Sequence, residues 1–497
     1  MLPDLTLPAI DASSRFPAAS DLQDLDMLLV LLPVSTKPAA LARLPAARHW
    51  QDLLLEAPPI AGSARSTVLG NPARTLAVLG FHADGSEIFA LASTAARMMA
   101  LAGNRRARVG LLAIAGNRKN IAAGLEALAS ASLAADFALP RYQGKPGARA
   151  PRIKSLRLFG SDALDLRLLA ANARANNLAR WLTALPTNKL DVAAYRRLLT
   201  QLARSKKLQL TWYGEARLRK LGAEAFLAVS RGSKLRNGGI ALLRYRPKLP
   251  RKRPAIALVG KGIVFDTGGT NLKPHRAMLD MHTDMAGSAV ALAATLAMVE
   301  LESRQPIDCW LAITDNAIGS GAYRPQEIVR AANGVHIQVI HTDAEGRMAL
   351  ADTLALASRE RPEAIIDFAT LTGACVYALT ERMSGLFSND VALERRLQDA
   401  ANRCGERLHA FPMPEDFDSD LHSDNADVMQ CAVEGKGDHI LAARFLSRFV
   451  DKSIPWAHID LAAASRKGGL GAIATEITGF GAVLAVTALL GERQRRR

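Results

Sequence analysis

The chain has 497 residues, of which 49% are hydrophobic and 22% are charged, and its formal net charge is +16. This composition excludes fibrous and intrinsically disordered proteins, and the length provides for two or three domains with buried cores. The basic charge leaves contact with nucleic acid or with an acidic surface open.

The N-terminal region alternates apolar strands with an alanine-rich helix. We predict strands at residues 27–34, 75–81 and 108–116 and a helix at 88–103. This alternation is typical of an α/β domain, which we place at residues 1–160.

Neither the first residues nor the apolar runs indicate export or a membrane span. The opening stretch MLPDLTLPAIDASS lacks the basic region and the apolar core of a signal peptide. The longest apolar runs fall well short of the ~20 residues that cross a bilayer. We therefore expect a cytoplasmic protein without membrane contact.

A linker is predicted between two domains. Glycine, proline and basic residues gather at 141–152, which predicts an exposed loop. Residues 163–185 then place apolar side chains at helical spacing, so we expect a long connecting helix within a linker at residues 161–190. The larger C-terminal domain follows at residues 191–497.

The C-terminal domain has the pattern of repeated βα units. Its predicted strands are 255–260, 307–314, 337–340, 363–373 and 456–464, and its predicted helices are 284–302 and 345–360. The fold class is therefore α/β, with a smaller N-terminal domain and a larger domain whose central mixed sheet is flanked by helices. In such sheets, polar groups that carry chemistry collect at strand ends, where helices begin.

Positive charge is concentrated in one segment. Residues 141–253 contain 27 lysines and arginines and five acids, a net charge of +22, which leaves −6 for the rest of the chain. Such a segment could attract nucleic acid, or its basic residues could simply be solvated on helix faces. We favour the second interpretation.

Acids and basic residues are gathered in three segments at predicted strand ends and helix starts. The residues concerned are Lys261, Asp266 and Lys273, then Asp284, and finally Asp343, Glu345 and Arg347 within HTDAEGRMALADTL, residues 341–354. A buried carboxylate without a partner is very costly, so these segments need basic partners or metal ions.

Two interpretations of this charged cluster remain open. Four acids and three basic residues could pair in a salt-bridge network. Alternatively, the four carboxylates supply the hard oxygen ligands that would hold two divalent ions about 3.5 to 4 Å apart. Lys261 could bind a metal only as the free amine, which a nearby dication favours by lowering the lysine pKa. We favour hydrolysis at paired metal ions.

Other catalytic motifs are incomplete or absent from the sequence. The segment around Lys261 is not a phosphate-binding loop, because Ala255 and Gly262 occupy the positions of its first glycine and its serine or threonine. The ten histidines form no HExxH motif, and there is no GxSxG nucleophile elbow. The four cysteines lie far apart, so we expect reduced, largely buried thiols rather than a zinc site or a disulfide framework.

Several segments closely resemble the motifs of the leucyl aminopeptidase family, also called the cytosol aminopeptidases. The segments are VGKGIVFDTGGTNLKP, MHTDMAGSAV, HTDAEGRMALADTL and ATLTGAC followed by GLFSND, and they occur in the family's order and spacing. The resemblance covers roughly residues 170 to 485. It implies a dinuclear, zinc-dependent metallopeptidase that releases the N-terminal residue of peptides.

The resemblance also implies a ligand set for the two ions. One ion would be held by Lys261, Asp266, Asp284 and Glu345, and the other by Asp266, Asp343 and Glu345, so that Asp266 and Glu345 bridge. Zinc is the usual metal in the family, and manganese, cobalt or magnesium can occupy the looser site.

The catalytic residues implied by the resemblance are Lys273 and Arg347. Lys273 would stabilise the oxyanion, and Arg347, together with the helix N-terminus behind it, would hold a bicarbonate ion that acts as general base. The pocket for the first side chain would include Met281, Thr370, Gly373 and Ala463, which suits leucine or another apolar residue. Core packing is an equal alternative for each of these residues.

Further properties follow from the resemblance alone. Family members are homohexamers with active sites that face an inner cavity, and some also bind DNA. We therefore expect a hexamer that acts on peptides, with DNA binding through residues 141–253 as a possible second role. Cleavage of another peptide, such as Cys-Gly, by the same metals remains open.

Overall fold

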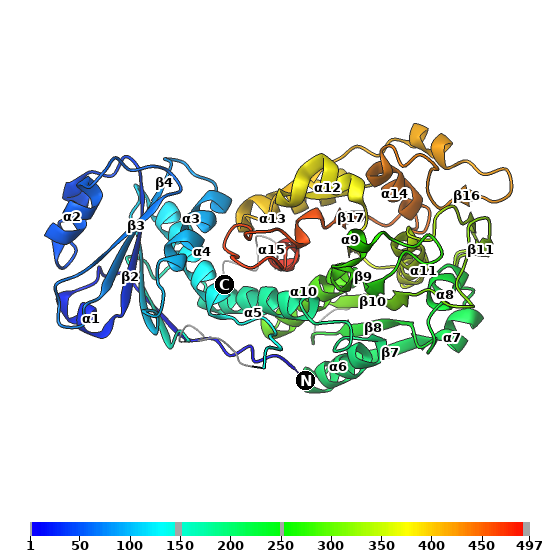
Figure 1. Ribbon diagram of the computed structural model, residues 1–497, viewed down its shortest axis with the longest axis horizontal. Coiled ribbons are helices and arrows are strands. Elements are labelled where there is room, and N and C mark those ends of the chain that lie inside the picture. The colour runs from blue at the N-terminus through cyan, green and yellow to red at the C-terminus, as the bar shows by residue number, and fades with distance from the viewer. Residues whose placement is uncertain (1, 145–151, 249–252, 491–497) are drawn as a thin grey trace.

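The computed structural model describes residues 2–144, 152–248 and 253–490. Within these residues the strands form a six-stranded, an eight-stranded and a three-stranded sheet, which we call the N-terminal, central and small sheets. Figure 1 shows the N-terminal sheet at one end of the molecule and the central sheet on the far side of helix α5 (Leu166–Thr183). This arrangement confirms the predicted α/β fold with a smaller N-terminal part and a larger part built on a mixed sheet.

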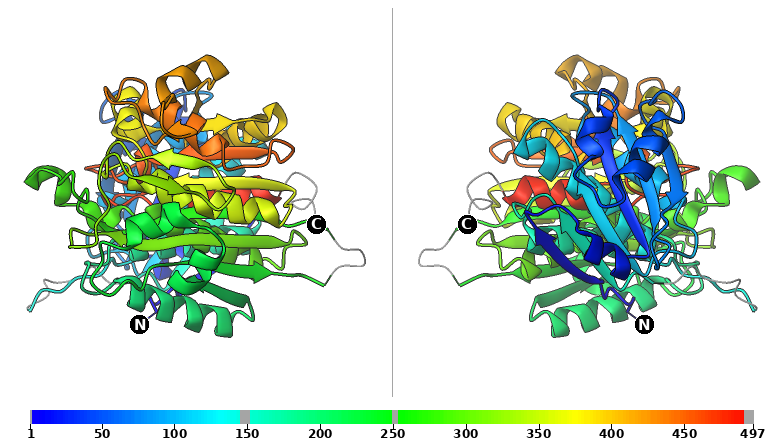
Figure 2. Two further views of the ribbon diagram at one scale, coloured as in Figure 1. Left: turned by 90° about the vertical axis from the view of Figure 1, so that its right-hand side faces the viewer. Right: turned by 90° about the vertical axis from the view of Figure 1, so that its left-hand side faces the viewer.

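The N-terminal sheet is parallel except at one edge, where the last two strands run antiparallel. Its strands in spatial order are β1 (Ala9–Ser13), β6 (Ser155–Phe159), β5 (Arg108–Ala113), β2 (Met27–Pro33), β4 (Leu76–His82) and β3 (Ala64–Val68). Its helices are α1 (Ala19–Asp24), α2 (Ala47–Leu55), α3 (Ile88–Ala100) and α4 (Arg118–Asp136). Figure 2 shows this end of the molecule foremost in its right-hand view.

The apolar run of β2 is explained by burial on both faces of the sheet. Met27, Leu29 and Leu31 pack into a core with α3 and α4. Their neighbours Leu28 and Val30 pack into a second core with α1 and α2. Because side chains alternate along a strand, a strand covered on both sides is apolar throughout.

The central sheet is mixed. Its strands in spatial order are β15 (Leu408–Ala410), β14 (Ser384–Ser388), β17 (Trp456–Asp460), β13 (Ala364–Ala369), β9 (Ile256–Asp266), β10 (Ile307–Asn316), β8 (Gly239–Tyr245) and β7 (Gln209–Gly214). The middle strands β17, β13, β9 and β10 are parallel to one another. On one side β8 runs antiparallel to β10 and β7 runs antiparallel to β8, and on the other side β14 runs antiparallel to β17. The parallel middle is where the predicted βα units lie.

Helices cover both faces of the central sheet. The first face packs against α5, α6 (Val192–Ser205), α10 (Ala286–Glu300), α13 (Val391–Cys404) and α15 (Ala482–Leu490). The second packs against α7 (Glu215–Lys220), α8 (Glu224–Ser230), α11 (Glu345–Arg359) and α14 (Asp438–Ser447). Helix α10 is buried along almost its whole length, which explains why its alanine-rich sequence is apolar all round.

Short elements complete the chain. They are the helices α9 (His275–Met278) and α12 (Gly373–Leu379) and the 3-10 turns η1 (Pro38–Leu41), η2 (Met281–Thr283), η3 (Thr380–Arg382), η4 (Glu415–Leu421) and η5 (Ala462–Ala464). The small sheet consists of β11 (Ile328–Arg330), β12 (His336–Gln338) and β16 (Val428–Met429). The strand predicted at 337–340 therefore belongs to the small sheet and not to the central one.

Strand β9 is longer than the predicted strand 255–260. It pairs with β13 only as far as Gly260, but its pairing with β10 continues to Asp266. The pairing with β10 is irregular near its end, because β9 advances from Ile263 to Asp266 while β10 advances only from Thr314 to Asn316. The last six residues of β9 thus extend beyond β13, and Lys261 begins this extension.

Many basic residues of the 141–253 segment form ion pairs with acids outside it. Examples are Arg174 with Glu300, at 2.5 Å, and Arg246 with Asp308, at 2.6 Å. Residues 145–151 and 249–252 lie outside the described residues, and they include most of the loop predicted at 141–152. Part of this positive charge is therefore neutralised by acids elsewhere in the chain, which differs from the favoured interpretation of residues that are simply solvated on helix faces.

The predictions about the cysteines and about membrane spans concern the chain as a whole. Cys309, Cys375 and Cys431 are buried, Cys404 is partly buried, and all four, which lie in the described residues, are free thiols as predicted. Among the helices of the described residues, none combines the length and the apolar composition that a membrane span requires.

Candidate metal centre

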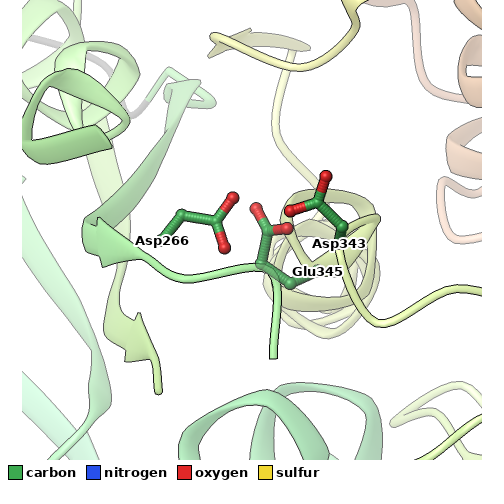
Figure 3. Close-up of side chains that lie close together, drawn as sticks. All are labelled: Asp266, Asp343 and Glu345. Atoms are coloured by element: carbon green, nitrogen blue, oxygen red, sulfur yellow. The ribbon is translucent and has the colours of Figure 1, made fainter. Parts of the chain in front are cut away.

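Three carboxylates meet where β9 ends and α11 begins. Asp266 is the last residue of β9, Glu345 is the first residue of α11, and Asp343 lies in the turn before it. One oxygen of each lies within 4.8 Å of the others, and Figure 3 shows the three side chains converging. The sequence-predicted ligands from two separate segments are thus brought together.

Lys261 and Asp284 join this group from the side of β13. The Lys261 ammonium lies 2.9 Å from Asp284 Oδ1 and 3.0 Å from Glu345 Oε1, and it also donates to the Thr370 carbonyl at 2.9 Å. Asp284 lies just before α10 and accepts a hydrogen bond from the Thr370 hydroxyl at 2.7 Å. All five predicted ligands therefore form one continuous cluster.

The second lysine of the cluster, Lys273, lies on the opposite side. Its ammonium is 2.9 Å from Asp266 Oδ2 and 2.6 Å from Asp343 Oδ1. The loop that carries it turns at Gly268, where φ is +87° and where a Cβ would lie 2.9 Å from Asp343 Oδ1. Glycine is required there because φ is positive and because a Cβ would also lie 2.4 Å from the Asn271 carbonyl oxygen.

Burial and like charges perturb the carboxyl groups. Burial, reinforced by Asp266, raises the pKa of Glu345 to about 8, and burial raises the pKa of Asp284 to about 6. Burial also lowers the pKa of Lys261, but the neighbouring carboxylates outweigh this and raise it overall. The protein thus brings together negative charges that repel one another, which is the electrostatic signature of a site for cations.

The residues present fit divalent metal ions. Asp284 Oδ2 and Glu345 Oε2 are buried, and neither has a hydrogen-bond partner among the described residues. Four carboxylates share only two lysines, because the third predicted cation, Arg347, is paired elsewhere. A salt-bridge network would therefore leave buried acids uncompensated, whereas hard dications would satisfy their oxygens.

Arg347 pairs with a carboxylate that the sequence did not suggest. Its guanidinium Nη2 lies 2.8 Å from Asp438 Oδ2, at the start of α14. Burial lowers the pKa of Arg347, but the Asp438 charge outweighs it and the pKa is raised overall. The proximity of Asp438 could not be predicted, since 91 residues separate it from Arg347.

The cluster opens into a hollow of about 900 Å³. Met281, Thr370 and Gly373, three of the four predicted pocket residues, line this hollow. Ala463 does not, because it is fully buried in the middle of turn η5, where its neighbours Ala462 and Ala464 line the hollow instead. The wall predicted at Ala463 is thus formed by the residues on either side of it.

Two further residues support the cluster and were missed in the sequence. Asn316, the last residue of β10, donates from Nδ2 to Asp266 Oδ1 at 2.8 Å and to the Thr342 carbonyl at 3.0 Å. The buried Tyr323 hydroxyl donates to the same carbonyl at 2.8 Å. Asn316 could have been found from the sequence, because it is a polar residue just after the strand predicted at 307–314.

Comparison with known proteins identifies the family to which the chain belongs. Residues 177–486, more than half of the chain, match the catalytic domain of the cytosol aminopeptidase family. The chain belongs to this family. As a cytosol aminopeptidase family member, it is a metal-dependent aminopeptidase, a hydrolase of peptide bonds, as the resemblance of its motifs implied.

Individual members of the cytosol aminopeptidase family are similar over about two thirds of the chain. A probable cytosol aminopeptidase of Parasynechococcus marenigrum is 41% identical over 352 residues, which cover 68% of this chain and 71% of the relative. One of Geobacter sulfurreducens is 38% identical over 333 residues, or 66% of each chain.

The similarity to a solved structure extends over nearly the whole chain. The bottromycin maturation enzyme BotP in complex with Mn is 28% identical, with a TM-score of 0.81, and the match covers 93% of this chain and 98% of that one. The N-terminal sheet is therefore included in the structural similarity, although it lies outside the residues that match the family's catalytic domain.

Proposed function

We propose that this chain is a dinuclear leucyl aminopeptidase that removes N-terminal leucine, or another apolar residue, from peptides. The observation that carries the proposal is the convergence of four carboxylates and two lysines in one hollow, with buried carboxylate oxygens that have no partner among the described residues. In this proposal Lys261, Asp266, Asp284 and Glu345 hold one ion. Asp266, Asp343 and Glu345 hold the other.

The metal ions and the chain have distinct tasks in the proposed reaction. Two bound dications would supply an activated water, polarise the scissile carbonyl and hold the free α-amine of the substrate. Lys273 would donate a hydrogen bond to the oxyanion that forms when water adds to the carbonyl. Its contacts with Asp266 and Asp343 keep its ammonium at the edge of the cluster, facing the hollow.

The pocket for the first side chain is proposed at Met281, Thr370 and Gly373. Gly373 has open space where a Cβ would lie, and Met281 supplies a flexible apolar wall. Together with Ala462 and Ala464, beside the originally predicted Ala463, these small or flexible residues suit an apolar side chain of the size of leucine.

The types of ligand atom indicate which metal ions the two sites would accept. Oxygen-rich coordination with one amine accepts zinc or manganese, and cobalt or magnesium are further candidates for the site without the lysine. BotP is a structure in complex with Mn, which makes manganese a sensible first choice for reconstitution.

Bicarbonate fits the Arg347 site less well. Arg347 is buried, and it already has the Asp438 carboxylate as its counter-ion. Only Nε lacks a partner within the described residues. The proposed reaction therefore contains no bicarbonate step.

A homohexamer in the cytoplasm remains part of the proposal, on the resemblance alone. DNA binding through residues 141–253 is proposed only as a secondary role, because several of its arginines are already paired with acids. DNA binding of this kind would survive loss of the metal ligands and would weaken steeply with salt if it depended on charge alone.

The aminopeptidase assignment predicts a metal-dependent activity with a requirement for a free amine. Protein reconstituted with Mn²⁺ or Zn²⁺ should hydrolyse leucine p-nitroanilide, and a chelator should abolish this activity until metal is restored. The N-acetylated substrate should not be cleaved. Release of nitroaniline is followed spectrophotometrically, and cleavage that persists in excess chelator would refute the proposal.

Metal binding is expected to release protons and to tighten as the pH rises. Glu345, whose pKa is raised to about 8, is largely protonated in the metal-free protein at pH 7, and Lys261 carries its ammonium proton. Both protons must leave when a dication binds, so affinity should increase between pH 6 and pH 8. The same raised Glu345 pKa means that its contribution to the stability of the metal-free fold declines from about pH 4.5 to pH 8.

Calorimetry in buffers of different ionisation enthalpy counts these protons. Glu345→Gln should release fewer protons than the wild-type protein at the same pH. Binding without proton release at pH 7 would contradict this account of the site.

A further inference from the structure

The ion pair between Arg347 and Asp438 is built into the wall of the catalytic hollow. Arg347 lies in the first turns of α11 and is only 2% exposed. Its Nη2 is 2.8 Å from Asp438 Oδ2, and its Nη1 donates to the Gln430 carbonyl at 3.4 Å. The guanidinium is thus held from two sides by the chain itself.

Asp438 is placed by the start of its own helix. It is the first residue of α14, directly after Gly437, whose φ is +63°. Asp438 and Arg347 both line the hollow that contains the predicted ligands, and the Asp438 side chain is 23% exposed. One oxygen of the carboxylate is bonded to Arg347, and the group as a whole remains in contact with the hollow.

A buried guanidinium needs an anion, and two sources compete for that position. A dissolved anion loses translational entropy when it binds. A carboxylate that is fixed at a helix start has already lost its freedom of motion during folding, so its contact with the guanidinium carries no further cost of this kind. A second anion would also be repelled by Asp438, whose charge already acts on the same guanidinium. The chain's own carboxylate therefore has the advantage.

We infer that Asp438 is the resident anion of Arg347 and takes the place that family resemblance gives to bicarbonate, so that this enzyme works without bicarbonate. Like bicarbonate, the Asp438 carboxylate supplies the negative charge that the buried guanidinium requires. Asp438 is in this sense a positioning residue, which holds Arg347 and keeps the anion site filled. The inference rests on the proposed function only for its activity measurements.

The test compares wild-type protein with Asp438→Ala, in buffers freed of carbon dioxide and in the same buffers with millimolar sodium bicarbonate. The wild-type rate on leucine p-nitroanilide should change less than about twofold. Asp438→Ala should lose at least about tenfold in kcat without bicarbonate, since each tenfold corresponds to about 1.4 kcal/mol. Added bicarbonate or formate should restore most of that loss.

A second readout does not depend on activity. Isothermal titration of bicarbonate into zinc-loaded protein should give no saturable binding to the wild type and saturable binding to Asp438→Ala. If Asp438→Ala fails to fold because Arg347 is left unpaired, Asp438→Ser keeps a smaller acceptor, leaves room for an anion and should show the same rescue. The matched control is Asp418→Asn, which removes a carboxylate from the Arg444 ion pair outside the hollow and should gain no bicarbonate response.

Two results would overturn the inference: saturable bicarbonate binding with stimulation in the wild type, or full activity of Asp438→Ala in bicarbonate-free buffer. Failure of the proposed function looks different. It would appear as a metal-loaded wild-type protein without aminopeptidase activity, and the calorimetric comparison would still decide which anion occupies Arg347.

Discussion

Replacing Glu345 by alanine is expected to lower kcat/KM for leucine p-nitroanilide by about 10³-fold or more. Glu345 touches Lys261, lies within reach of Asp266 and Asp343, and is proposed to bridge both ions. Its loss removes a shared ligand, and loss of several kcal/mol of transition-state stabilisation corresponds to that factor. Metal content should fall together with activity.

The measurement combines steady-state kinetics with elemental analysis of the purified variants. Glu345→Gln removes the charge and nearly preserves the shape, so it separates loss of a ligand from loss of packing. Glu360→Ala, at the exposed far end of the same helix, is the matched control and should keep wild-type kinetics and metal content. Two bound ions and normal turnover in Glu345→Ala would be incompatible with the proposed centre.

Replacing Lys273 by methionine is expected to lower kcat by about 10² to 10³-fold and to leave KM within a few fold. This is the usual effect of removing one group that stabilises a developing oxyanion. Unlike the Glu345 variant, Lys273→Met should still bind both ions, because Lys273 contacts carboxylate oxygens and is not a proposed ligand.

Metal titration followed by calorimetry distinguishes these two cases. The exposed Lys220→Met on α7 controls for the general effect of losing a lysine. If Lys273→Met loses its metal ions, Lys273 is needed to form the metal centre. If kcat is unchanged, Lys273 has no role in catalysis.

The helices and the strand that bring the proposed metal ligands together could be predicted from the sequence. Helices α10 and α11 and the core of β9 have strong apolar patterns, and the polar residues stand at their boundaries, so convergence of Asp266, Asp284 and Glu345 could be expected. The roles of individual residues were inferred from the resemblance of the motifs, because the spacing of apolar residues indicates helices and strands but no chemical role.

The features that escaped prediction depend on tertiary contacts. Asp438 lies in a helix far from α11 in the sequence, and its bond to Arg347 is visible only after folding. Ala462 and Ala464 line the hollow in place of the predicted Ala463 because of the directions in which side chains project from a 3-10 turn. The extension of β9 beyond Gly260 depends on its pairing partner β10, and a strand's own pattern does not specify its neighbour.

The irregular pairing near the end of β9 has a consequence for the proposed metal ligands. Lys261 and Asp266 are five positions apart, so in a regular strand they would project to opposite faces of the sheet. The one extra residue that β9 carries between Ile263 and Asp266, relative to β10, reverses the alternation once and returns Asp266 to the side of Lys261. Deleting a single residue there would leave a continuous sheet in which the Asp266 carboxylate points away from the proposed metal centre.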